Sequence, residues 1–136
     1  MNQNFMMPHQ RLGPRAEYHS QESLRIQNSD SLEKAYRKLK VLKLNLTFYN
    51  PQGVSRLGEI KYKFNLDIAK SIFRFNCPND ECVRGDFDLT AELAKAVAGR
   101  RKTVTGEMCC QGWRNKTTID SEHCHNIARY ELTLGY

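Results

Sequence analysis

Residues with metal-binding chemistry are concentrated in the second half of the chain. All five cysteines of the 136 residues lie there, and the first 76 residues contain none. Zinc in proteins takes four ligands in a tetrahedron, most often thiolates and imidazoles. The clustering of such groups predicts one zinc ion held by ligands from separate loops. The thiols and imidazoles of this segment belong to Cys77, Cys82, Cys109, Cys110, His123, Cys124 and His125.

Four of the cysteines are the predicted ligands. Cys77 and Cys82 enclose four residues, a spacing typical of a ligand pair in a turn, and Pro78 stiffens that turn. Cys110 ends a predicted strand on its apolar face, and Cys124 shortly precedes the last predicted strand. We therefore predict a zinc site made of Cys77, Cys82, Cys110 and Cys124.

Alternatives for single ligands and for the chemistry of the site stay open. Cys109 can replace Cys110, and His123 or His125 can replace Cys124. Four thiolates fill the coordination sphere, whereas a catalytic zinc keeps one position for water, so we expect a structural ion. A small metal- or thiol-dependent enzyme that uses Cys109 or His125 beside the metal is a competing hypothesis. Free, partly buried cysteines that behave as small hydrophobes are another.

Two short runs carry a resemblance to a known kind of metal site. Residues 75–82 read Phe-Asn-Cys-Pro-Asn-Asp-Glu-Cys, and residues 110–113 read Cys-Gln-Gly-Trp. Over about residues 73–136 the chain resembles a zinc ribbon, in which two cysteine-bearing loops clamp one metal at the end of an antiparallel sheet. It is similar to uncharacterised bacterial proteins of this type. The resemblance implies Zn²⁺ and the same four ligands, but no activity. The chain departs from the ribbon because thirteen residues separate Cys110 from Cys124.

The charge of the chain bears on its partners. A net charge of +6 permits an anionic partner, nucleic acid or protein, without requiring one. The candidate contact for such a partner is a basic group that we expect close to the metal loops, namely Arg100, Arg101, Lys102, Arg114 and Lys116. A nucleic-acid-binding zinc ribbon is therefore an alternative to a plain binding or scaffold module.

Further cations are predicted on the outward faces of strands, at Lys43, Lys61, Lys63, Arg74 and Arg129. Binding of a single-stranded nucleic acid would also need aromatic rings exposed among them. The strand aromatics Tyr62, Phe64 and Tyr130 are predicted to point inward. We therefore interpret these cations as a solvated face, on which lysine also prevents edge-to-edge pairing of sheets.

The remaining patterns predict the framework of the site. A capping box that starts at Asp30, with Glu33 three residues later, predicts a short helix to about residue 37. The main helix is predicted over residues 89–98, where apolar residues recur along one face. About five strands and one main helix indicate an α+β fold with a mostly antiparallel sheet and a zinc-ribbon-like metal site. Alternation of apolar and polar residues predicts strands at residues 40–49, 59–66, 71–76 and 103–110, and from residue 127 onward.

The N-terminal part differs in composition from the rest. The first 29 residues are rich in Asn, Gln, Ser, His and Pro and show no apolar period, so residues 1–29 are predicted to form a disordered tail. Residues 30–136 would then form a single zinc-stabilised domain. The N-terminus lacks the basic and apolar segments of a signal peptide, and no run reaches transmembrane length. We therefore expect a cytoplasmic protein without a membrane partner, whose thiols stay reduced.

Overall fold

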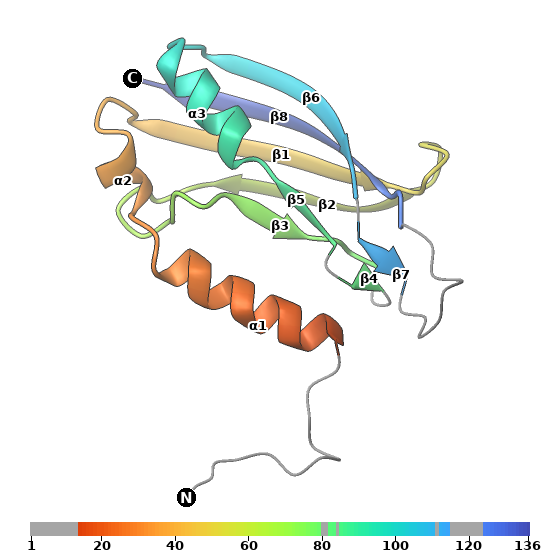
Figure 1. Cartoon of the computed structure of the whole chain (residues 1–136). Helices are drawn as coiled ribbons and strands as arrows, with labels where there is room; N and C mark the ends of the chain where they lie inside the picture. The colour runs from red at the N-terminus through yellow and green to blue at the C-terminus, as the bar shows by residue number, and fades with distance from the viewer. Residues whose placement is uncertain (1–13, 80–81, 84, 111, 115–123) are drawn as a thin grey trace, which may run out of the picture.

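The centre of the protein is a four-stranded antiparallel sheet with the strand order β2-β1-β8-β6 (Figure 1). Its strands are β1 (Val41–Tyr49), β2 (Arg56–Lys63), β6 (Thr103–Cys109) and β8 (Ile127–Gly135). The first and last strands of the chain therefore lie side by side in the middle of the sheet. The computed structural model describes residues 14–79, 82–83, 85–110, 112–114 and 124–136.

Shorter elements complete the fold. Two two-stranded sheets accompany the main one, and three helices are present in the described part of the chain. The predicted α+β class and mostly antiparallel sheet are confirmed. The small sheets pair β3 (Arg74–Asn76) with β5 (Asp86–Asp88) and β4 (Cys82–Val83) with β7 (Trp113–Arg114). The helices are α1 (Pro14–Gln27), α2 (Leu32–Ala35) and α3 (Thr90–Ala98).

One face of the main sheet forms the core. Along β1, Leu42, Leu44, Leu46 and Phe48 are buried and alternate with more exposed residues, as the period-two pattern predicts. Helix α3 and the β3–β5 pair lie across this face (Figure 1) and bury apolar side chains such as that of Leu93 against it. Each fully buried leucine contributes about 2 kcal/mol by removing apolar surface from water. The sheet thus has one buried, apolar face and one face that carries polar side chains.

The first short helix begins one residue later than predicted. Ser31, not Asp30, is the N-cap of α2, and its side chain accepts a hydrogen bond from the Lys34 backbone amide at 3.2 Å. The carbonyl of Asp30 instead accepts from the amide of Ser71, and Ser31 forms a β-bridge with Lys70. Because the Asp30 carbonyl already accepts from Ser71, the first hydrogen bond of the helix goes to the carbonyl of Ser31 instead, which accepts from the Ala35 amide.

Helix α1 occupies residues that composition assigned to a disordered tail. The prediction was wrong for Pro14–Gln27, because the helix is anchored by polar contacts that apolar patterning does not detect. The side chain of Arg74, predicted to point outward, is only 3% exposed, and its Nε lies 2.8 Å from Asp86 and 3.5 Å from Glu22 of the helix. The Tyr18 hydroxyl donates to Asp86 at 3.1 Å, and the Arg74 guanidinium stacks over the Tyr18 ring. The part of the predicted tail at residues 1–13 lies outside the described residues.

Candidate metal centre

The structure brings together the four predicted cysteines. The sulfurs of Cys77, Cys82, Cys110 and Cys124 all lie within 4.8 Å of one another, and each residue is at most 1% exposed. The Cys82 and Cys110 sulfurs are 3.5 Å apart, and those of Cys77 and Cys124 are 3.7 Å apart. A regular tetrahedron with metal–sulfur bonds of about 2.3 Å has sulfurs about 3.8 Å apart. Four buried thiols of this spacing could hold a metal ion.

Each of the four cysteines lies where a strand meets a loop, at one end of the sheet. Cys77 follows β3 and Cys82 begins β4, while Cys110 follows β6 and Cys124 precedes β8. Pairing of β4 with β7 connects the two cysteine-bearing loops. Four segments that are distant in the sequence therefore converge on one point.

Backbone hydrogen bonds hold the second pair of cysteines in place. The Cys110 amide donates to the carbonyl of Asn126 at 2.7 Å, and the Cys124 amide donates to that of Gly112 at 2.7 Å. The His125 amide donates a hydrogen bond to the Cys110 carbonyl at 3.2 Å. The thirteen residues between Cys110 and Cys124 are thus closed at their base, and the two sulfurs meet although their spacing is long.

Two glycines pack their backbones directly against the sulfurs. A Cβ on Gly85 would overlap the Cys82 sulfur and lie 2.8 Å from that of Cys110. A Cβ on Gly112 would lie 2.5 Å from the Cys82 sulfur and would overlap the Cα of Gly85. Both positions require a residue without a side chain because the loops close over the thiols. Sequence reasoning missed both residues, although Gly112, two residues after Cys110, stands where a ligand-binding turn often needs glycine.

Amide groups donate hydrogen bonds to the sulfurs. The side chain of Asn126, only 6% exposed, donates to Cys77 at 3.7 Å, and that of Asn79 donates to Cys124 at 3.6 Å. The Gly112 backbone amide donates to Cys110 at 3.4 Å. Such donors stabilise negative charge on thiolates and orient them toward a cation. The two asparagines were not among the residues singled out from the sequence.

The thiols of the cluster differ in their readiness to ionise. A hydrogen bond from Cys110 is the main cause that lowers the pKa of Cys77 to about 5. The same hydrogen bond is the main reason why the pKa of Cys110 is raised, since Cys110 keeps its proton to donate it. Burial raises the pKa of Cys82 to about 12. The tendency to ionise is therefore divided unevenly among the thiols, and a cation bound by all four would displace the protons that remain.

The alternative ligands lie elsewhere or outside the described residues. Cys109 is exposed and does not belong to the buried group, because successive side chains of a strand point to opposite faces. His125 is exposed and has a positive φ of 56°. His123 lies outside the described residues.

The predicted anionic contact is divided by the fold. Arg100, Arg101 and Lys102 precede β6, whereas Cys110 follows it, so the length of the strand, about 23 Å, separates them from the cysteines. The expectation that these cations lie close to the cysteine-bearing loops was wrong, since β6 separates the two groups along its length. The side chain of Arg114 and all of Lys116 lie outside what the structure describes.

Comparisons with known proteins add no assignment to this geometry. No family model, no curated protein and no solved structure matches the chain. Among the described residues, none of the helices combines the length and the apolar character needed to cross a membrane.

Proposed function

We propose that the four cysteines bind one Zn²⁺ as a structural ion in a small binding or scaffold module. The single observation that carries this proposal is the complete set of four buried sulfurs within 4.8 Å of one another. A tetrahedral set of four thiolates suits Zn²⁺ or iron. We choose Zn²⁺ because closed sites of four thiolates are a common structural use of zinc.

The enclosure of the site supports a structural ion over a catalytic one. A catalytic zinc keeps a position open to water or substrate. Here four thiols complete the coordination sphere, and the backbones of Gly85 and Gly112 press against the sulfurs. With two cysteine-bearing loops at the end of an antiparallel sheet, the arrangement resembles a zinc ribbon. Bound metal would connect the β3–β4 loop to the segment after the end of β6 and to the segment before the start of β8.

A structural ion of this kind contributes directly to folding. Apparent binding free energies of structural Zn²⁺ in small zinc-finger peptides are about 10–16 kcal/mol at neutral pH, and this energy becomes folding free energy. The ligands must be deprotonated and reduced, and no disulfide joins any of the five cysteines here. We therefore place the protein in the reducing cytoplasm.

Elemental analysis of protein purified without chelator tests the proposal. We expect one Zn²⁺ per chain and four thiols protected from a thiol reagent, while Cys109 reacts. Removal of the metal should expose all five thiols to the reagent. The Cys124→Ser variant should lose the metal, and Cys109→Ser is its matched control, since it removes a thiol without removing a ligand. Bound iron, or a metal-free preparation that does not take up Zn²⁺, would reject the proposal.

Oxidation is the competing explanation for four close thiols. The contacts at 3.5 and 3.7 Å would then be precursors of Cys82–Cys110 and Cys77–Cys124 disulfides. Intact mass spectrometry of protein purified with and without reductant distinguishes the two cases. A loss of four hydrogens without metal would support disulfides and contradict the zinc proposal.

A further inference from the structure

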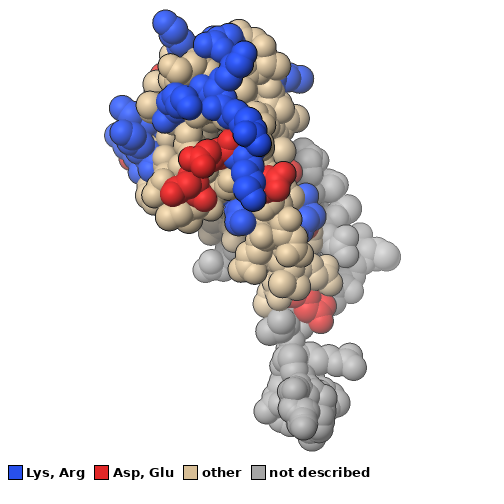
Figure 2. Space-filling view, turned by 90° about the vertical axis from the view of Figure 1, so that its left-hand side faces the viewer, with Lys and Arg blue, Asp and Glu red and all other residues tan. Residues whose placement is uncertain are grey.

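The end of the main sheet opposite the cysteines carries a concentration of exposed cations. Strands β1 and β6 begin there, and β2 and β8 end there. Figure 2 looks onto this end, where blue side chains extend across the surface around a smaller acidic group. We call it the basic end and define it by eight exposed residues: Arg37, Lys38, Lys40, Lys43, Lys63, Arg100, Arg101 and Lys102.

The fold assembles the basic end from three separate parts of the sequence. The Lys40 amide donates to the carbonyl of Gly135 at 2.7 Å, and the Leu134 amide donates to that of Lys102 at 2.8 Å. Lys43 and Lys63 are direct cross-strand partners in the β1–β2 ladder. The C-terminal part of β8 thus lies between the two basic segments and holds them at fixed places.

The charge at this end is largely uncompensated. In the described part of the chain, the cations that form ion pairs are Arg25, Arg56, Lys61, Arg74 and Arg129, and none of them belongs to the basic end. Three acidic residues, Glu33, Asp67 and Glu131, line hollows that they share with four of the eight cations, Arg37, Lys40, Lys43 and Lys63. Like charges directly opposite each other in a sheet are destabilising, and Lys43 faces Lys63. A bound anion would remove this repulsion.

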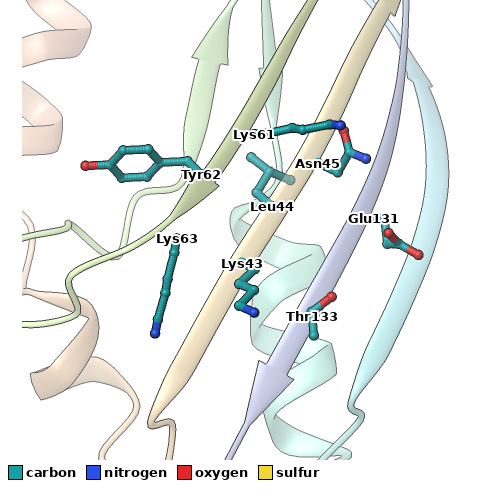
Figure 3. A pocket seen from close by; sticks show the side chains of 8 residues that line it. All are labelled: Lys43, Leu44, Asn45, Lys61, Tyr62, Lys63, Glu131 and Thr133. Carbon is teal, nitrogen blue, oxygen red and sulfur yellow. The ribbon is translucent and has the colours of Figure 1, made fainter.

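An exposed aromatic ring lies near these lysines, on the other face of the edge strand β2. Tyr62 was predicted to point into the core, but it is 58% exposed. The reason is that β2 is the edge strand, so residues on its inward face lie beyond the elements that cover the rest of the sheet. Figure 3 shows Lys43 and Lys63 extending in the same direction from neighbouring strands, while Tyr62 projects from β2 away from them.

The position of the Tyr62 ring is set by its neighbours. Its ring packs edge-on against Phe64 with centroids 5.0 Å apart, and Phe64 packs in the same way on the buried Phe73. Tyr62 lines one hollow with Lys43, Lys61 and Lys63, and a second with Phe64, Asn65 and Ile68. An oriented ring with an exposed surface therefore stands between a cationic hollow and a largely apolar one.

We propose that the basic end and Tyr62 bind single-stranded nucleic acid. Proteins that bind single strands combine a cationic track for the phosphates with aromatic rings on which bases stack. Lys43, Lys63 and the other cations of the basic end supply the track. Tyr62, on the other face of β2, supplies a stacking surface that a strand reaches by passing over this edge of the sheet. An anionic membrane or an acidic protein would use the charge but would have no specific need for the oriented ring. This surface is separate from the cysteine cluster, so the inference does not depend on the identity of the metal.

Fluorescence anisotropy with a labelled oligothymidylate, on the full chain as purified with any bound metal, tests the inference. We expect saturable binding that weakens with salt, with a slope of log K against log salt of about −0.7 for each phosphate contacted. The Lys43→Glu/Lys63→Glu variant should weaken binding at least tenfold and reduce that slope by about 1.4. Tyr62→Ala should weaken binding about 5- to 150-fold with the slope unchanged, and Tyr62→Phe should restore it.

A matched control keeps the charge change constant. Arg56→Glu/Arg129→Glu alters two ion-paired cations of the same sheet face by the same net charge and should bind like the unaltered protein. Circular dichroism and metal content establish that each variant is folded. Equal losses in the control and in the lysine variant, or no saturable binding of oligothymidylate at low salt, would overturn the proposal. Binding to vesicles of anionic lipid or to polyglutamate in place of the oligonucleotide would overturn it as well.

Discussion

Replacing Gly85 by alanine should weaken metal binding although every ligand remains. The added Cβ would overlap the Cys82 sulfur, lie 2.8 Å from the Cys110 sulfur and approach the Cβ of Cys77 to 3.2 Å. Gly85 does not have a positive φ, so alanine brings no backbone strain of its own. The effect therefore reports on the space around the sulfurs alone.

The size of the loss in metal affinity depends on how far the atoms around the added Cβ can move. Overpacking a close-packed interior costs about 1–3 kcal/mol, and more where the neighbours cannot yield. Here the neighbours are sulfurs that a tetrahedral metal would hold at bonded distance, and they cannot separate without lengthening metal–sulfur bonds. We expect a loss at the upper end, about 3 kcal/mol, which corresponds to metal binding weakened about 150-fold.

Competition with a chromophoric zinc chelator measures this change. The control is Gly58→Ala, because a Cβ there meets only the Phe48 ring at an ordinary 3.9 Å. The control should bind metal like the unaltered protein and be equally or slightly more stable, since alanine restricts the unfolded chain. A Gly85→Ala variant with unchanged metal affinity would refute the view that the loops are closed against the sulfurs.

Three further predictions concern the ligands, the pH and the N-terminal helix. Cys109→Ser should keep full metal content and melting temperature, whereas Cys110→Ser should lose the metal, and elemental analysis would contradict the assignment if the two behaved alike. Because the pKa of Cys82 is raised to about 12 and that of Cys110 is also raised, these thiols are protonated at neutral pH without metal, so metal binding should release protons and strengthen as pH rises. Calorimetry in buffers of different ionisation enthalpy counts the protons, and a count of zero would show the sign to be wrong. Arg74→Met leaves Asp86 and Glu22 without their buried cation, so the free energy of unfolding measured in urea should fall by about 3 kcal/mol. Limited proteolysis should then release α1. An α1 that stays protected would show that these contacts do not anchor it.

Local patterns were sufficient to predict the central strands and to single out the four cysteines that the fold brings together. The alternation that buries Leu42, Leu44 and Leu46 is a property of the β1 sequence itself, because successive side chains of a strand face opposite sides. The same rule places Cys109 and Cys110 on opposite faces, although the sequence alone left Cys109 open as an alternative ligand. Thiol chemistry then limits what four clustered cysteines can bind.

The tertiary structure decided what depends on neighbours in space. Whether the inward side of β2 is covered depends on the strand order, which no local pattern contains, and so Tyr62 is exposed where its alternation predicted burial. Helix α1 is held by Arg74 and Asp86, which lie far along the chain from it, and its own composition gives no sign of that contact. The need for glycine at positions 85 and 112 likewise arises only when four distant segments converge on the sulfurs. Chemistry carried by single residue types could be predicted from the sequence, whereas exposure, anchoring and close packing required the fold because each is a relation between segments that are distant in the chain.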